Sequence, residues 1–89
     1  MSYEILSTTA ATKVGDTAQG IGPNSTFQVD LGGRASSTVK IEVSNDNKIW
    51  LELGIIENAG GIASLASWQF YRANLTASSG AGTLKVWMN

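Results

Sequence analysis

The chain has 89 residues, a net charge of −1 and neither cysteine nor histidine. Its length accommodates one domain and leaves no room for a second. The composition excludes disulfides and Ser-His-Asp or Cys-His catalysis, and a zinc site would have to be built from carboxylates alone. The six Lys and Arg residues are scattered, so we expect no nucleic-acid partner.

The N-terminus has no basic region followed by an apolar run, so we expect a complete chain without a signal peptide. No stretch approaches the roughly 18 apolar residues of a membrane helix, and we expect no membrane partner. Charged residues make up only 15% of the chain, and small residues replace them. A small domain without disulfides or metals gains stability from association, which predicts a homo-oligomer.

The first third of the chain predicts short strands over residues 3–7, 12–17 and 26–31, with a loop at 20–24. The segment 8–22 is either a flexible arm that reaches a neighbouring subunit or an ordinary pair of edge strands.

A β-hairpin is predicted next. Residues 39–43 alternate apolar and polar side chains, residues 44–48 are turn formers, and the alternation resumes over 49–53. This alternation places Trp50 and Glu52 on the outer face. The side chains expected to point inward are Val39, Ile41, Val43, Ile49, Leu51 and Leu53.

The end of the chain predicts a second hairpin, formed by residues 70–77 and 83–88 around a Gly/Ser turn, after a weaker strand candidate at 62–68. Leu84, Val86 and Met88 are expected on one face and Trp87 on the other. In total, about seven or eight short strands predict a single all-β domain over residues 1–89, an antiparallel β-sandwich or jelly roll.

Catalytic and metal sites are not indicated. Several of the acidic residues fall on polar strand faces, where a solvated charge is the usual explanation, so we expect no enzyme activity. The Asn45-Asp46-Asn47 cluster lacks the glycine and distal glutamate of a calcium loop, and a hairpin turn explains it equally well. We therefore expect neither a cofactor nor a metal.

Two tryptophans lie on predicted polar faces. Trp50 and Trp87 are either interface anchors or side chains buried within the chain by a sandwich edge or a bulge. Arg72 could pair with Glu42 or Glu52, or lie against Trp87. The candidate interface residues are Trp50, Trp87, Arg72 and Glu52.

The stretch 39–50 contains Ser44, Asp46 and Trp50 in that order, and it resembles a hairpin of discoidin-like (galactose-binding-like) jelly rolls. Those jelly rolls also carry a late strand with an aromatic-x-Arg pattern, which is similar to the pattern that ends in Arg72 here. Small structural proteins of tailed bacteriophages resemble the chain more closely. They share the Gly-rich turn and the final Val-Trp-Met strand, and the resemblance covers roughly residues 37–89.

The bacteriophage resemblance implies a virion component, namely a head decoration or cement protein. Such a protein binds the major capsid protein or another virion protein, stabilises the capsid shell and needs no catalytic group. Multivalent attachment lets modest contacts sum to firm binding. Two alternatives stay open. One is a carbohydrate-binding module, which the discoidin-like hairpin implies, and the other is a tail or neck connector of the virion.

Overall fold

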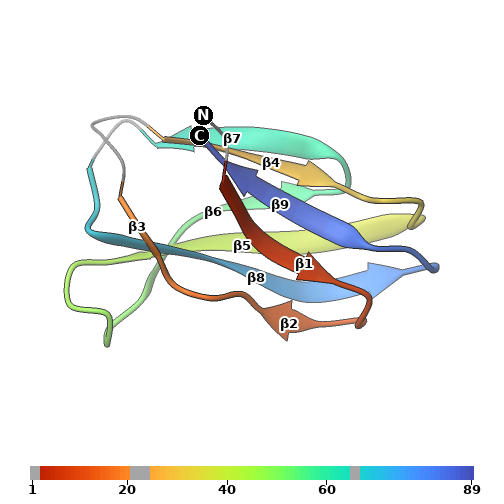
Figure 1. Ribbon diagram of the computed structural model, residues 1–89, viewed down its shortest axis with the longest axis horizontal. Coiled ribbons are helices and arrows are strands. Elements are labelled where there is room, and N and C mark those ends of the chain that lie inside the picture. The colour runs from red at the N-terminus through yellow and green to blue at the C-terminus, as the bar shows by residue number, and fades with distance from the viewer. Residues whose placement is uncertain (1–2, 21–24, 65–66) are drawn as a thin grey trace.

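The computed structural model describes residues 3–20, 25–64 and 67–89, which form two packed antiparallel sheets (Figure 1). The first sheet has the strand order β1 (Tyr3–Thr8), β9 (Leu84–Met88), β4 (Ser25–Asp30) and β7 (Gly60–Ser64). The second has the order β2 (Lys13–Val14), β8 (Phe70–Ser79), β5 (Ser36–Ser44) and β6 (Leu51–Glu57), and β3 (Ala18–Gln19) also pairs with β8. The predicted all-β sandwich is confirmed.

The strand pairing is nested, as in a long hairpin that has been rolled up. β5 pairs with β6, β4 with β7, the β2 and β3 strands with β8, and β1 with β9. Rolling also brings β9 against β4 and β8 against β5. With β2 and β3 taken as one interrupted strand, this is the jelly-roll arrangement, one of the two architectures that the sequence predicts.

The core lies between the sheets and comes from alternate residues of the central strands. The largest rings in it, Phe27 and Tyr71, meet with centroids 5.3 Å apart at 46°. Burying each apolar side chain of this kind contributes roughly 1.5–3 kcal/mol. Around this pair lie the buried side chains of Val29, Val39, Ile41, Val43, Ile56, Ala73, Leu75, Leu84, Val86 and Met88.

The N-terminal segment forms two edge elements. In β1 the register shifts between Glu4 and Leu6, so the consecutive residues Ile5 and Leu6 are both buried. Of the strand predicted over 12–17, only β2 forms, at Lys13–Val14; β3 follows at Ala18–Gln19, outside the predicted range, and Gly15 lies between the two. A Cβ on Gly15 would lie 2.6 Å from the Ile5 carbonyl oxygen. The described part of 8–22 therefore follows the edge-strand alternative, and most of the loop predicted at 20–24 lies outside the described residues.

The second predicted hairpin is wrong. β8 pairs with β5, whereas β9 pairs with β1 and β4 in the other sheet. The turn between β8 and β9 carries the chain from one sheet to the other, with Gly80 and Gly82 at positive φ. Alternation indicated both strands correctly, but it contains no information about which strands pair. The expected inward set, Leu84, Val86 and Met88, is confirmed.

The first predicted hairpin is confirmed as β5 and β6, but part of its inward set is wrong. Ile49 and Leu51 are 70% and 54% exposed. The reason is that β6 begins at Leu51, later than predicted, so Ile49 belongs to the turn. A register shift then places Leu53 as an extra residue before Gly54. Leu53 is partly buried against the core, in agreement with the prediction, and the next buried side chain is Ile56. The weak strand predicted at 62–68 is β7, which begins earlier, at Gly60; residues 65–66 lie outside the described residues.

A buried arginine joins three segments of the chain at one end of the sandwich. Arg34, between β4 and β5, is 5% exposed. Its Nε donates to the Gly82 carbonyl (3.0 Å), Nη1 to Ser78 Oγ (2.7 Å) and Nη2 to the Thr8 carbonyl (2.8 Å). Ser78 Oγ in turn donates to the Ala11 carbonyl. Within the described residues no carboxylate pairs with this cation.

Candidate functional site

The outer face of the β8-β5-β6 sheet brings together three of the four predicted interface residues. Arg72 lies opposite Glu42 in the strand register, and its Nε donates to Glu42 Oε1 at 2.7 Å. Its guanidinium carbon lies 4.2 Å from the centroid of the Trp50 ring. Of the partners left open by the sequence, Arg72 therefore contacts Glu42, and it also contacts Trp50. Trp50 is half-buried against this cation.

Glu52 belongs to the same charged face. It lies opposite Glu42 in the register, which sets two like charges side by side. Arg72 neutralises Glu42, and Lys40 Nζ lies 3.5 Å from Glu52 Oε1. Both side chains of the Lys40–Glu52 pair are well exposed, so this ion pair contributes about 0–1 kcal/mol. The four charges sum to zero.

Trp87 lies on the other sheet and does not join this group. It is half-buried and lies opposite Glu4 and Gln28 in the strand registers. Lys85 Nζ is 6.0 Å from its ring centroid and 3.8 Å from Glu4 Oε2. A shallow groove of about 630 Å³ runs beside Trp87, with Gln28 and Asn89 in its lining. The predicted interface residues are thus divided between the two sheets.

The Ile49 turn, residues 45–50, joins β5 to β6 and is held by side-chain hydrogen bonds. Asp46 Oδ1 accepts the backbone N–H groups of Lys48 and Ile49, both at 2.9 Å, and the Ser44 hydroxyl at 2.9 Å. Asn47 adopts a φ of 60°. These short polar side chains replace the missing ladder bonds and leave Ile49 pointing outward. The turn-forming residues predicted a turn at this place, but the apolar-polar alternation that resumes at Ile49 made the predicted turn too short.

The Asp46 hydrogen bonds make this turn sensitive to acid. The backbone N–H of Ile49, followed by that of Lys48 and the Ser44 hydroxyl, holds the pKa of the Asp46 carboxyl below its ordinary value of 3.8. A lowered pKa in the folded state means that the carboxylate stabilises the turn above the ordinary value, and that this contribution is lost as pH falls through the folded-state pKa.

We therefore expect the turn to loosen only in strong acid. An NMR titration of the Asp46 carboxyl carbon should give a pKa below 3.8, and Asp46→Asn should remove the matching acid step in the amide signals of the turn. Asp30→Asn is the matched control, because Asp30 Oδ1 accepts the Gly32 N–H in a different loop. An Asp46 pKa at or above 3.8 would contradict the assignment.

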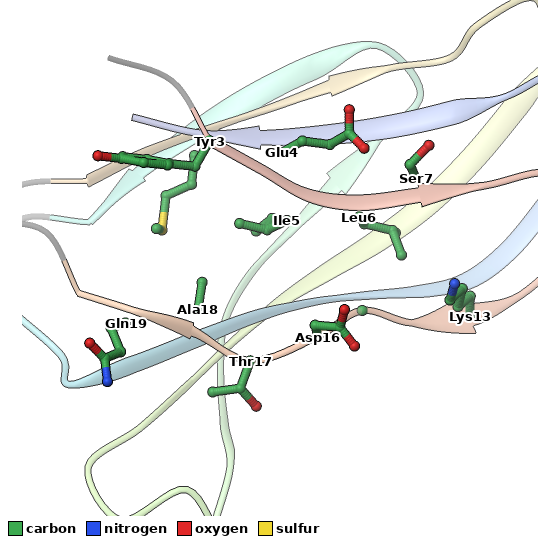
Figure 2. A pocket seen from close by; sticks show the side chains of 12 residues that line it. Tyr3, Glu4, Ile5, Leu6, Ser7, Lys13, Asp16, Thr17, Ala18 and Gln19 are labelled. Carbon is green, nitrogen blue, oxygen red and sulfur yellow. The ribbon is translucent and has the colours of Figure 1, made fainter.

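A groove of about 510 Å³ opens between β1 and β3, at one edge of the sandwich. Figure 2 shows Ile5 and Leu6 reaching from β1, and Ala18 from β3, toward the space between these strands. Met88 completes this apolar floor. The rim of this β1–β3 groove is polar and includes Tyr3, Glu4, Ser7, Lys13, Asp16, Thr17 and Gln19.

Comparisons with protein-family models, with curated proteins and with solved structures found no match. In the described ranges, no group of three or more Asp or Glu side chains is placed to hold a metal ion. The same ranges contain no helix long and apolar enough to cross a membrane.

Proposed function

We propose that this chain is a non-enzymatic virion protein of a tailed bacteriophage, and that it decorates the capsid exterior by binding the major capsid protein. The observation that carries the proposal is the apolar edge of the second sheet. β6 is an edge strand, and Leu51 and Ile55 on it are 54% and 44% exposed. An edge strand with exposed apolar side chains is a template for contact with another protein.

The bacteriophage-like segment 37–89 supports the assignment to a virion, and it includes β6 and the Ile49 turn. Jelly rolls occur in viral capsid proteins and in lectins, so the fold is compatible with this role. A rigid sandwich that carries a preformed contact edge loses little conformational entropy on docking, which suits a protein bound in many copies.

Binding to undecorated capsids tests the proposal. The purified protein should saturate the capsid lattice at a fixed copy number, measured by co-sedimentation and by electron microscopy of the particles. Ile55→Asp should weaken this binding by about tenfold or more, because it places a charge at the apolar edge. Val14→Asp is the matched control, since Val14 is 50% exposed but lies on β2, away from β6. Failure of the wild-type protein to bind capsids would overturn the proposal.

Carbohydrate binding is a second candidate, favoured by the groove beside Trp87. An indole ring next to the amide side chains of Gln28 and Asn89 offers stacking and hydrogen bonding to a sugar. Trp50 fits this role less well, because Arg72 already lies against its ring. Titration with oligosaccharides, followed by indole fluorescence in wild type and Trp87→Phe, distinguishes the two candidates. A saturable change that disappears in the variant would favour sugar binding.

A further inference from the structure

The Ile49 turn presents its most exposed apolar side chain on a rigid support. Ile49 is 70% exposed, more than any other large hydrophobic among the described residues. Its own N–H is bonded to Asp46, and its neighbour Trp50 is fixed against Arg72. A side chain whose backbone is already ordered loses little further entropy when it enters a partner, which is a property of interface hot spots.

The β1–β3 groove has complementary features. Its floor of Ile5, Leu6, Ala18 and Met88 is apolar, and its volume of about 510 Å³ is ample for an aliphatic side chain. Its charges complement the turn as well. Lys48, next to Ile49, and Asp16, on the groove rim, each form no ion pair within the described residues. A Lys48–Asp16 contact between copies would satisfy both charges while Ile49 enters the groove.

The turn and the groove form one continuous patch. Thr17, which lines the groove, donates from its Oγ1 to Asn47 Oδ1 in the turn at 3.2 Å. This bond holds the turn at the rim, and the exposure of Ile49 means that the side chain does not fill its own groove. A patch that contains both a projection and a recess is self-complementary about a two-fold axis, because each copy then offers its turn to the groove of the other.

We propose that a second copy of this chain occupies the β1–β3 groove, with Ile49 of each copy inserted between β1 and β3 of the other and Lys48 paired with Asp16. The result is a closed two-fold dimer with two equivalent contacts. The inference deepens the homo-oligomeric decoration role proposed above by naming the surface that joins the copies. Ile55, which is used above to test capsid binding, lies outside both the Ile49 turn and the β1–β3 groove.

Analytical ultracentrifugation of the full chain tests this assignment. Wild type should sediment as a dimer, and Ile49→Asp should raise the dimer dissociation constant by about tenfold or more. Ile55→Asp is the matched control, because Ile55 is also exposed but lies outside the turn and the groove. It should leave the dimer unchanged. A wild-type monomer, or equal effects of the two substitutions, would overturn the proposal.

Charge reversal adds a test that requires direct contact. Lys48→Glu and Asp16→Lys should each weaken the homodimer, because each sets like charges together at both contacts. The double variant should regain most of the lost affinity. Mixing the two single variants should also restore dimer affinity. One contact of the resulting heterodimer keeps the native Lys48–Asp16 pair, and the other joins the two substituted side chains, which carry opposite charges. Absence of rescue in both experiments would show that positions 48 and 16 do not meet.

Capsid binding measured in parallel separates this inference from the proposed function. If wild type is monomeric yet saturates capsids, the dimer proposal fails and the decoration role stands. If the Ile49-dependent dimer forms but capsids remain bare, the decoration role fails and the dimer stands. If the protein is monomeric and Ile49→Asp weakens capsid binding, the Ile49 turn contacts the capsid, and the assignment to a second copy is overturned.

Discussion

Replacing Arg34 with methionine is expected to lower the free energy of unfolding by about 3 kcal/mol. Methionine retains an unbranched apolar stem, but it donates no hydrogen bond. The Thr8 and Gly82 carbonyls and Ser78 Oγ then lose the donors they have in the folded protein. An acceptor left without a donor costs about 1–3 kcal/mol where it is buried, as the Thr8 carbonyl is, and less at the part-buried Gly82 carbonyl and Ser78 Oγ. Removing the desolvated cation offsets part of this sum, because within the described residues no carboxylate pairs with Arg34.

Urea unfolding followed by circular dichroism measures the effect. Arg34→Lys should be intermediate, because a single ammonium cannot replace the guanidinium fork that reaches the end of β1, the end of β8 and the turn after β8. Lys40→Met is the control: it removes a cation from the sheet surface, where the side chain is 39% exposed and its partner Glu52 is 47% exposed, and it should cost less. A midpoint for Arg34→Met equal to that of wild type would mean that the three segments hold together without the guanidinium.

Gly32→Ala is expected to cost about 3 kcal/mol or more. Gly32 has a φ of +60°, and an added Cβ would lie 1.7 Å from the Thr83 carbonyl oxygen, so the backbone of one loop must move. Its neighbour Gly33 has a φ of +100°, but an added Cβ would meet nothing closer than the Ala81 carbonyl oxygen at 3.6 Å. Gly33→Ala should therefore cost only the backbone strain, about 1–2 kcal/mol.

The comparison of adjacent glycines isolates the steric contribution. Both substitutions add one methyl group to the same turn, and both sites have a positive φ. Thermal melts of the two variants should therefore differ mainly through the contact between Gly32 and Thr83. Equal losses at the two positions would show that the loop can separate from Thr83 at little cost, and that the close approach is not needed for stability.

Period-two alternation predicted the strands and their inward faces where a strand is buried on one side. Val39 and Ile41, and likewise Leu84 and Val86, follow that pattern along their strands. It could not predict the pairing of β8, because the turn at Gly80 and Gly82 is short enough for a hairpin and yet crosses between sheets. The partners of a strand depend on the whole topology, which no local pattern contains.

The candidate site was predicted in part. Alternation placed Trp50 on the outer face, and the structure adds the Arg72 guanidinium that contacts its ring. Ile49 was assigned inward because the same alternation was extended into a turn that Asp46 controls. Arg34 gave no signal, since an arginine between two glycines and an alanine is typical of an exposed loop. Its burial depends on three segments that only the folded chain brings together.

The nested strand order also constrains how the chain can acquire its structure. Among the strands that the structure describes, only β5 and β6 pair across a short turn, so they can associate early. β1, in contrast, must find β9 at the opposite end of the sequence. Closing that longest loop becomes less costly once the inner pairs have formed. During synthesis, β1 has no partner strand until residues 84–88 have left the ribosome. We therefore expect slow, late completion of the first sheet, as is usual for proteins rich in non-local contacts.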